Sequence, residues 1–312
     1  MNLKFSKLNI LVIGEAMLDV YSYGKSYRES PEGPIPVIVD SNEEYLLGGA
    51  ANVANNIKKL DAQVSLISIL GKDSEGAVIK KLLNKSDINT ERLLELNEYS
   101  TIVKKRIFAN DQPIARIDRE VIKQNDNLKF QKNNLILEGY DGVIISDYDK
   151  GLITEKSARN IIRACNKFNI PVIVDTKKTN FDCFSGASFI TPNISEIKSV
   201  LNTSKNFDSI SQECFELVKR LKLKEGLLIT KSEKGMSLFT SKELFSEDGL
   251  SVKNPDVSGA GDTVVAIFTL SYLSKNKLED CLKISNFAGS IVVNKKNTAL
   301  VSTKEIKSAF NN

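Results

Sequence analysis

The stretch GVIISDYDKGLITEKSARNIIRACNKFNIPVIVD, residues 142–175, places two short apolar runs on either side of a segment with helical spacing. The runs GVIISD and IPVIVD are apolar up to their polar carboxyl ends, as expected for strands that are covered on both faces. Between them, the apolar residues of SARNIIRACNKF lie three and four positions apart, which is typical of an amphipathic helix. This order predicts two strands of one parallel sheet, joined by a helix.

The same alternation continues along most of the chain. Further apolar runs are NILVIG, VSLISILG, ASFITP and GLLIT, and AANVANNIKKL is another segment with helical spacing. Buried strands that alternate with amphipathic helices predict a doubly wound α/β fold with a mostly parallel sheet. Because the chain has 312 residues, 41% of them apolar, we expect a single large domain over residues 1–312.

Two segments interrupt this alternation. Residues 19–47 contain three prolines, and residues 100–119, STIVKKRIFANDQPIARIDR, have the pattern of a hairpin that turns at NDQP. We expect these segments, from about 19–47 and 100–119, to form a small β lid beside the large sheet. Such a lid could close over a bound ligand.

The composition excludes several partners and locations. The chain has 43 Lys plus Arg against 39 Asp plus Glu without a long basic block, so we expect no nucleic-acid partner. No run reaches the roughly 20 apolar residues of a membrane span, and Glu15 and Asp19 interrupt the N-terminal run where a signal peptide needs its apolar stretch. The four cysteines show no C-x-x-C spacing, which favours neither zinc nor disulfides. We therefore expect a cytoplasmic protein without a membrane partner.

The absence of histidine narrows the chemistry further. With 0 His in the chain, no imidazole can act as a base, a metal ligand or a member of a catalytic triad. No G-x-G-x-x-G motif occurs, which disfavours a Rossmann dinucleotide site. No G-x-x-x-x-G-K-[ST] motif occurs either, so any ATP would be bound without a Walker loop.

The segment NPDVSGAGDTVVAIF, residues 254–268, ends a polar turn and opens into an apolar run. The small residues Gly259, Ala260 and Gly261 would let backbone N–H groups approach an anion at the N-terminus of a helix. Asp262 beside this cradle could take a proton from a hydroxyl group. Alternatively, Asp262 only interacts favourably with the helix dipole, and the glycines only form a turn.

The segment LGGAANVANNI, residues 47–57, is a second candidate site. Gly48 and Gly49 permit a close backbone approach at a helix start, and the amides of Asn52 and Asn55 suit sugar hydroxyls. A helix cap in a glycine-rich turn would give the same pattern. Asp19 follows the first strand, near the edge where open α/β sheets bind ligands.

The segments TPNISE, residues 191–196, and TKSEKG, residues 230–235, each follow a predicted strand. Asn193 and Glu196 would share one helix face and could hold a hydrated Mg²⁺ that screens phosphates, or they could form an ordinary helix start. Thr230, Lys231 and Gly235 suit nucleotide phosphates. The alternative for them is a hairpin with a surface lysine.

The order and spacing of these segments along the chain resemble those of the PfkB or ribokinase-like family of sugar kinases. The segments are residues 47–57, 191–196, 230–235 and 254–268. GGAANVA resembles the first signature of that family, and DVSGAGDT, residues 256–263, resembles the second. The resemblance covers nearly the whole chain and implies a ribokinase-like fold with a lid, and an ATP-dependent carbohydrate kinase that uses Mg²⁺. It leaves a need for K⁺ open.

Position by position, the resemblance implies that Asp262 is the catalytic base, beside the N–H groups of residues 259–262. It implies that the sugar is held by Asp19, Gly48, Gly49 and Asn52. It also implies that Asn193 and Glu196 orient Mg²⁺ through water. The residues that it implies for ATP are Asn193, Ile194, Ser195, Glu196, Thr230, Lys231, Gly235 and Asn286.

Within the family, segments such as KKRIFANDQPIARIDRE and ISDYDKGLIT resemble the subgroup that phosphorylates D-glycero-β-D-manno-heptose 7-phosphate at its C1 hydroxyl. The product, heptose 1,7-bisphosphate, would serve ADP-heptose and lipopolysaccharide core synthesis. Of the cations available for the 7-phosphate, we favour Arg106 and Lys177. Two departures from the family pattern are Glu15, where many relatives have Asp, and Ser258, where Thr is frequent.

Many members of this subgroup carry a second, nucleotidyltransferase domain with an H-x-G-H signature, which a chain without histidine cannot contain. We therefore expect only the kinase activity. Lids in this family often pair between subunits, so we expect a homodimer through the lid. The alternatives are a PfkB kinase for another sugar, sugar phosphate or nucleoside, and a catalytically silent sugar-binding regulatory protein.

Overall fold

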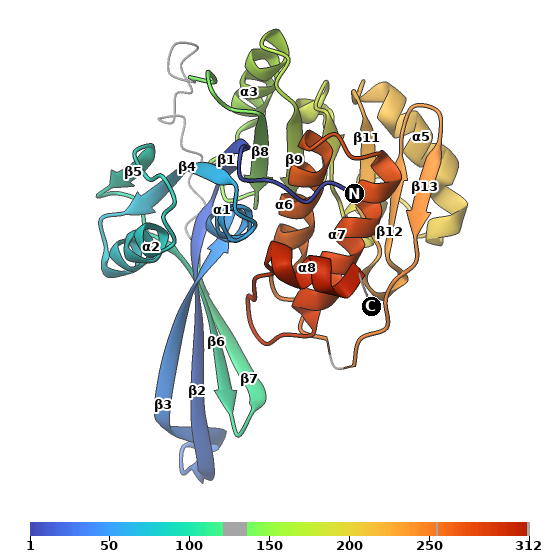
Figure 1. Cartoon of the computed structure of the whole chain (residues 1–312). Coiled ribbons are helices and arrows are strands. Elements are labelled where there is room, and N and C mark those ends of the chain that lie inside the picture. The colour runs from blue at the N-terminus through green and yellow to red at the C-terminus, as the bar shows by residue number, and fades with distance from the viewer. Residues whose placement is uncertain (121–135, 254, 311–312) are drawn as a thin grey trace.

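The structure is a computed structural model that describes residues 1–120, 136–253 and 255–310. The strands of its main sheet are β1 (Asn9–Gly14), β4 (Gln63–Gly71), β5 (Leu93–Leu96), β8 (Gly142–Asp147), β9 (Val172–Thr176), β10 (Phe189–Ile190), β11 (Gly226–Thr230), β12 (Met236–Phe239) and β13 (Leu244–Glu247). They form a nine-stranded sheet in the order β13-β12-β11-β10-β9-β8-β1-β4-β5 (Figure 1). The pairs from β11 to β5 are parallel, and β12 and β13 are added antiparallel.

Helices cover both faces of this sheet. They are α1 (Ala50–Lys59), α2 (Ser74–Lys85), α3 (Glu155–Lys167), α4 (Ile194–Val200), α5 (Ser211–Arg220), α6 (Ala260–Leu273), α7 (Leu278–Val293) and α8 (Thr303–Phe310). Figure 1 shows α6, α7 and α8 together on one side of the sheet. The stretch of residues 142–175 forms the predicted unit, in which α3 connects β8 to its parallel neighbour β9.

Alternate side chains of the central strands face two separate cores. In β1, Ile10 and Val12 pack into the core beneath α1, α6 and α7, whereas Leu11 and Ile13 pack into the core beneath α3 and α5. Because both faces are buried, the central strands consist mostly of apolar residues, and polar ones such as Asp147 and Asp175 stand near the carboxyl ends of β8 and β9. The predicted doubly wound, mostly parallel α/β fold is confirmed.

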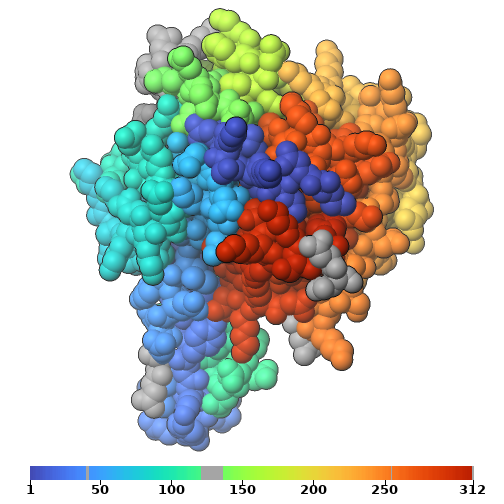
Figure 2. Space-filling model, viewed as in Figure 1, coloured from blue at the N-terminus to red at the C-terminus, as the bar shows by residue number. Residues whose placement is uncertain are grey.

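A second sheet stands apart from the main one. Its strands are β2 (Ala16–Ser30), β3 (Gly33–Gly49), β6 (Ile102–Ala109) and β7 (Gln112–Arg119), in the order β3-β2-β6-β7. Figure 2 shows this four-stranded sheet as a narrow arm that projects from the body of the molecule. Its strands contain the two segments that interrupt the alternation in the sequence.

The hairpin expected in residues 100–119 is confirmed. Ala109 of β6 pairs with Gln112 of β7, so the turn itself consists of Asn110 and Asp111. Both turn residues have positive φ, 51° and 62°, which suits the tight two-residue turn of a twisted hairpin. Among the described helices, none combines the length and the apolar character needed to cross a bilayer.

Candidate active site

Asp262 lies in the first turn of α6, where the two sheets meet the helical layer. Its side chain is only 5% exposed, and both carboxylate oxygens accept hydrogen bonds. Nδ2 of Asn52, from α1, donates to Oδ2 at 2.6 Å, and the hydroxyl of Tyr148, just after β8, donates to Oδ1 at 2.7 Å. Three segments that are distant in the sequence therefore meet at this one carboxylate.

Burial raises the pKa of Asp262 from 3.8 to about 6, although the hydrogen bonds from Asn52 and Tyr148 act in the opposite direction. The nearby charge of Asp19 raises the pKa further, and that of Lys177 lowers it. A carboxylate with this pKa is still ionised at neutral pH but is a stronger base than an exposed aspartate. Both properties suit a group that accepts a proton from an alcohol.

The small residues before Asp262 have different structural requirements. Gly259 has a φ of 73°, and a Cβ atom there would lie 2.8 Å from both Nδ2 of Asn52 and Cγ2 of Thr298. At Gly261, by contrast, a Cβ atom would meet no described atom within 4 Å. Because N–H groups in the first turn of a helix have no carbonyl partner within that helix, the α6 terminus can bind an anion at this open position.

The predicted sugar residues lie close together at the start of the second sheet. NH1 of Arg106 donates to Oδ1 of Asp19 at 2.7 Å, and Oγ1 of Thr298 donates to Oδ2 at 3.4 Å. Gly48 is packed against the same carboxylate, since a Cβ atom there would lie 2.7 Å from Oδ2. Asp19, Arg106 and Gly48 thus form one cluster, and Asn52 reaches Asp262 from the neighbouring helix.

Gly49 ends β3, directly precedes α1 as its N-cap, and so positions Asn52. It has a φ of 58°, and a Cβ atom there would lie 2.3 Å from the carbonyl oxygen of Glu15. The N–H of Ala50 donates to that same oxygen at 2.8 Å. The glycine is therefore required at this tight entry into the helix, in agreement with a glycine-rich helix start.

Lys177 connects two parts of the site. Its Nζ lies 2.5 Å from Oε1 of Glu196 and 5.9 Å from the ring centroid of Tyr148. Burial alone would lower the pKa of Lys177, but the charges of Asp175 and Glu196 raise it. Asp175, in β9, has a pKa raised to about 7 by burial. The ammonium group thus lies among carboxylates, between the first turn of α4 and the residues around Asp262.

Asn193 and Glu196 form a reciprocal capping box at the start of α4. Oδ1 of Asn193 accepts from the N–H of Glu196 at 2.9 Å, and Oε2 of Glu196 accepts from the N–H of Asn193 at 2.8 Å. The helix-start interpretation of this pair is therefore what the structure shows. The described residues contain no group of three or more His, Cys, Asp or Glu side chains placed to hold a metal ion. Since the carboxylate of Glu196 is already engaged, these residues fit a Mg²⁺ held through water rather than directly.

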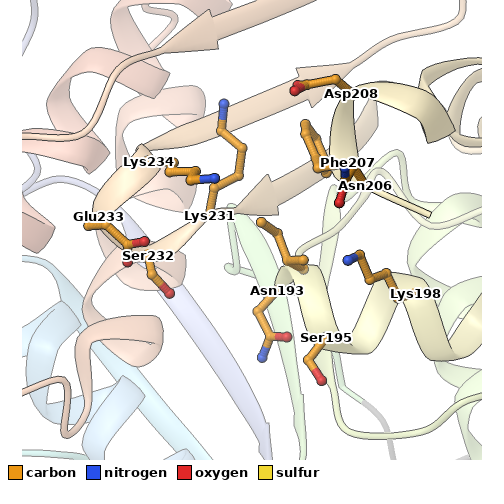
Figure 3. Close-up of a pocket in the computed structure, with 11 residues that line it drawn as sticks. Asn193, Ser195, Lys198, Asn206, Phe207, Asp208, Lys231, Ser232, Glu233 and Lys234 are labelled. Carbon is orange, nitrogen blue, oxygen red and sulfur yellow. The ribbon is translucent and has the colours of Figure 1, made fainter. Parts of the chain in front are cut away.

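A cavity of about 880 Å³ lies beside this capping box. Figure 3 shows Asn193 and Ser195 on one side of it, with Ser232, Glu233 and Lys234 on the other. The last three form η3 (Ser232–Lys234), the short connection between β11 and β12. The described residues that line the cavity are Asn193, Ile194, Ser195, Lys198, Asn206, Phe207, Asp208, Lys231, Ser232, Glu233 and Lys234.

Of the residues predicted to bind ATP, four line this cavity, namely Asn193, Ile194, Ser195 and Lys231. Nζ of Lys231 lies 5.4 Å from the ring centroid of Phe207, and burial lowers the pKa of this lysine. Three others lie next to the lining without being part of it, namely Glu196, Thr230 and Gly235. Asn286, on α7, is not part of the described lining, and its Nδ2 donates to the carbonyl oxygen of Asp248 at 2.7 Å.

Sequence reasoning missed the role of Tyr148 and of Glu15. Glu15 is 1% exposed, and its carboxylate accepts from the backbone N–H groups of Tyr148 at 2.9 Å, Leu152 at 3.1 Å and Lys150 at 3.2 Å. Burial raises the pKa of Glu15 to about 7. The position of Tyr148 directly after a parallel strand, at the edge where such sheets bind ligands, was the available signal.

Asn56, rather than Asn55, supports the side chain of Asn52. Nδ2 of Asn56 donates to Oδ1 of Asn52 at 3.3 Å, and Oδ1 of Asn56 accepts from the hydroxyl of Thr263 at 2.8 Å. This buried chain of hydrogen bonds joins α1 to α6 and fixes the amide that faces Asp262. The helical spacing of four positions places Asn52 and Asn56 on the same face.

The four-stranded sheet contacts the loop that follows α7. The hydroxyl of Tyr23 donates to Oδ1 of Asn297 at 2.6 Å, and Nδ2 of Asn297 donates to Oε2 of Glu44 at 2.8 Å. The backbone N–H of Asn297 donates to Oδ2 of Asp256 at 2.7 Å. One asparagine therefore connects the second sheet to the turn that leads into α6.

A doubly wound sheet, a projecting second sheet and a buried aspartate in the first turn of a helix together are typical of a carbohydrate kinase. A family model described as pfkB family carbohydrate kinase matches residues 7–305. The chain belongs to this family, and the expected class, an ATP-dependent carbohydrate kinase, is confirmed.

The chain is also similar in sequence to two curated bifunctional proteins. It is 35% identical over 310 residues to the bifunctional protein HldE of Pasteurella multocida, covering 98% of this chain and 64% of that protein. It is 37% identical over 307 residues to HldE of Helicobacter pylori, covering 97% of this chain and 66% of that protein. The chain thus spans about two thirds of the length of these relatives.

The solved structures confirm the ribokinase-like fold. Ribokinase of Arabidopsis thaliana, complexed with ribose and ATP, is similar with a TM-score of 0.76 and 21% identity, covering 98% of this chain and 99% of that one. Phosphofructokinase-2 of Escherichia coli, in complex with potassium, is similar with a TM-score of 0.79 and 19% identity, covering 97% and 98%.

Proposed function

We propose that this kinase transfers the γ-phosphoryl group of ATP to the C1 hydroxyl of D-glycero-D-manno-heptose 7-phosphate. The product would be heptose 1,7-bisphosphate, for ADP-heptose and lipopolysaccharide core synthesis. The observation that carries the proposal is the buried carboxylate of Asp262, held by Asn52 and Tyr148 beside the open terminus of α6. The similarity to HldE proteins supports the choice of a heptose phosphate.

In the proposed reaction, Asp262 accepts the proton of the C1 hydroxyl while the hydroxyl oxygen bonds to the γ-phosphorus. The bond between that phosphorus and the β–γ bridging oxygen breaks, and ADP leaves. The N–H groups of residues 259–262 stabilise the charge on the transferred phosphoryl oxygens. Bound Mg²⁺ supplies charge neutralisation across the phosphates, and Asn193 and Glu196 would orient it through water.

The sugar would lie between the two sheets, against Asp19, Gly48, Gly49 and Asn52. Arg106 and Lys177 are the cations that we assign to its 7-phosphate, although each is paired with a carboxylate in the structure. The phosphate would replace or share those partners. The four-stranded sheet would act as a lid that excludes water from the transferred group.

ATP would occupy the cavity beside α4, with Lys231 close to its phosphates and Phe207 available for an apolar contact. Thr230, Gly235 and Asn286 belong to the proposed nucleotide site as well. We also propose a cytoplasmic homodimer that pairs through the lid, since the edges of β3 and β7 are free of a strand partner in the described chain. A requirement for K⁺ would be found by replacing K⁺ with Na⁺ in the assay.

A coupled assay of ADP release tests the substrate. We expect kcat/KM to be higher for D-glycero-D-manno-heptose 7-phosphate than for ribose, fructose, fructose phosphates or nucleosides. A preference for an unphosphorylated sugar or a nucleoside would refute the heptose phosphate assignment while leaving the class of enzyme intact. Sugar binding without any ADP release would instead indicate a silent, regulatory protein.

A further inference from the structure

We infer that Tyr148 is a positioning residue for the catalytic base, which it holds through its hydroxyl group. The inference rests on the proposed role of Asp262 as the proton acceptor. The hydroxyl of Tyr148 donates to Oδ1 of Asp262 at 2.7 Å, so it acts on the carboxylate that would receive the sugar proton. Asn52 holds the other oxygen at 2.6 Å. Together the two donors fix the plane of the carboxylate.

The backbone of Tyr148 is itself held in place by buried groups. Its N–H donates to Oε2 of Glu15 at 2.9 Å, and Glu15 also accepts from Lys150 and Leu152 in the same turn. The preceding residue, Asp147, accepts from the hydroxyl of Thr176 at 2.8 Å. Since the turn is anchored on both sides, the direction of the tyrosine hydroxyl is determined before any substrate binds.

Two cations lie near the ring of Tyr148, one from each sheet. Nζ of Lys104, on β6, lies 5.8 Å from the ring centroid, and Nζ of Lys177, just after β9, lies 5.9 Å from it. Lys177 is also paired with Glu196 at the start of α4. Tyr148 therefore lies next to a lysine of the four-stranded sheet, next to the lysine that is paired with the start of α4, and against the base itself.

The chemistry of the hydroxyl defines its part in the reaction. Burial and the charge of Asp262 raise the pKa of Tyr148 well above its usual value, so the phenol stays protonated and donates its hydrogen bond. That hydrogen bond lowers the pKa of Asp262. Each carboxylate oxygen has a second lone pair, so the sugar hydroxyl can bind to Asp262 without displacing Tyr148. The tyrosine orients the base and takes no proton.

Tyr148→Phe tests the inference, because it removes only the hydroxyl. With the sugar of the panel that is turned over fastest, we expect kcat to fall about 10-fold, as for one hydrogen bond to a charged group. The acid limb of the kcat profile should move to higher pH by about one unit, because the carboxylate loses a donor. The KM for ATP should stay unchanged. Tyr140→Phe is the matched control, since Tyr140 contacts Arg92 through its ring, and it should leave rate and profile unchanged.

Four outcomes are informative. A Tyr148→Phe protein with the wild-type rate and pH profile overturns the inference. A lower rate with an unshifted acid limb also overturns it, because a merely structural loss would not change the titration of the base. Asp262→Asn, measured in parallel, separates the two proposals: if it retains turnover, the proposed base is wrong. If it is inactive while Tyr148→Phe behaves as wild type, only the role of Tyr148 is wrong.

Discussion

Nδ2 of Asn52 donates a 2.6 Å hydrogen bond to the carboxylate of Asp262, which lies 210 residues further along the chain. The two residues come from the two glycine-rich segments of the sequence, at the starts of α1 and α6. Through this hydrogen bond, a residue of the proposed sugar site directly contacts the proposed catalytic base. Substitutions around this contact can therefore separate binding from catalysis.

Asp262→Asn should lower kcat by about 10² to 10⁴, the usual contribution of a positioned base, while the fold and ATP binding remain. The coupled assay and calorimetric titration with ATP measure both. Asp280→Asn is the matched control, because Asp280 is also an acidic residue in the first turn of a helix. Equal and small effects of the two substitutions would show that Asp262 only serves the helix dipole.

The wild-type kcat should fall as the pH drops through about 6, because protonated Asp262 cannot accept the proton of the sugar. Well below that value, the expected slope is about tenfold per pH unit, as for a single protonation. Stopped assays of ADP release at a series of pH values between 8 and 5 measure how kcat falls with pH. A rate that stays constant over this range would contradict the raised pKa.

The free energy of unfolding should depend on pH in a way that Asp262→Asn removes. Since the pKa of Asp262 is raised from 3.8 to about 6 by folding, the folded state binds this proton more tightly than the unfolded state. The ionised carboxylate therefore destabilises the fold by roughly 3 kcal/mol above about pH 6, and this cost disappears as the pH falls towards 3.8.

Asp262→Asn should consequently be more stable than the wild type at pH 8, with a smaller difference at pH 5. Urea denaturation at the two pH values gives both free energies. Glu15 titrates in the same range but is present in both proteins, so its contribution cancels in the difference. The charge of Asp262 helps to raise the pKa of Asp175, so the loss of that charge lowers the pKa of Asp175 and adds to the stability of the variant at pH 8. The same advantage at both pH values would rule out this linkage.

The two glycines before Asp262 should respond differently to alanine. Gly259→Ala should lose about 1 to 3 kcal/mol of stability, because the residue has a φ of 73° and an added Cβ atom would lie 2.8 Å from side-chain atoms of Asn52 and Thr298. Gly261→Ala should keep or slightly raise stability, since it lies within α6 and its Cβ meets no described atom within 4 Å.

Gly261→Ala should nevertheless lower kcat/KM for ATP. The added methyl group would occupy the open space at the start of α6 where we propose that the phosphoryl oxygens bind. Thermal unfolding and the coupled assay, applied to both variants, distinguish the two effects. A fully active Gly261→Ala protein would show that the phosphates do not approach this turn.

Asn297→Ala should raise the KM for the sugar, because it removes the side-chain contacts of Asn297 with Tyr23 and Glu44 of the proposed lid. Two lost hydrogen bonds correspond to about a 10-fold change in kcat/KM. Asn294→Ala is the control, since the described hydrogen bond of that side chain goes to Ser290 within α7. An unchanged KM in the Asn297 variant would place the control of sugar binding elsewhere in the lid.

Much of the fold follows from local patterns. The apolar runs and the helical spacing of residues 142–175 predicted β8, α3 and β9, because strand and helix periodicity are recorded in neighbouring residues. The proline-containing and hairpin-like segments likewise predicted a separate sheet. The antiparallel pairing of β11 with β12 was given only as the alternative for residues 230–235, and it is what the structure shows. The addition of β13 was not predicted, since short strands carry little information about direction.

The candidate site was predicted only where a motif marks it. Asp262 and Asn52 stand in glycine-rich segments, whereas Tyr148 lies 114 residues from Asp262 in a turn without such a signal. The ion pair between Lys177 and Glu196 was also missed, because it depends on the distance between β9 and α4. Contacts between elements are set by packing, which a single sequence does not specify.

Glu15 lies at the junction of β1 and β2, and it touches both supports of the base. Its carbonyl oxygen accepts from Ala50 at the start of the helix that carries Asn52, and its carboxylate accepts from the N–H of Tyr148. The strands of the projecting arm leave the body at this same point, where Ala16 pairs with Gly49. Glu15 therefore connects the base of the arm to both hydrogen-bond donors of Asp262.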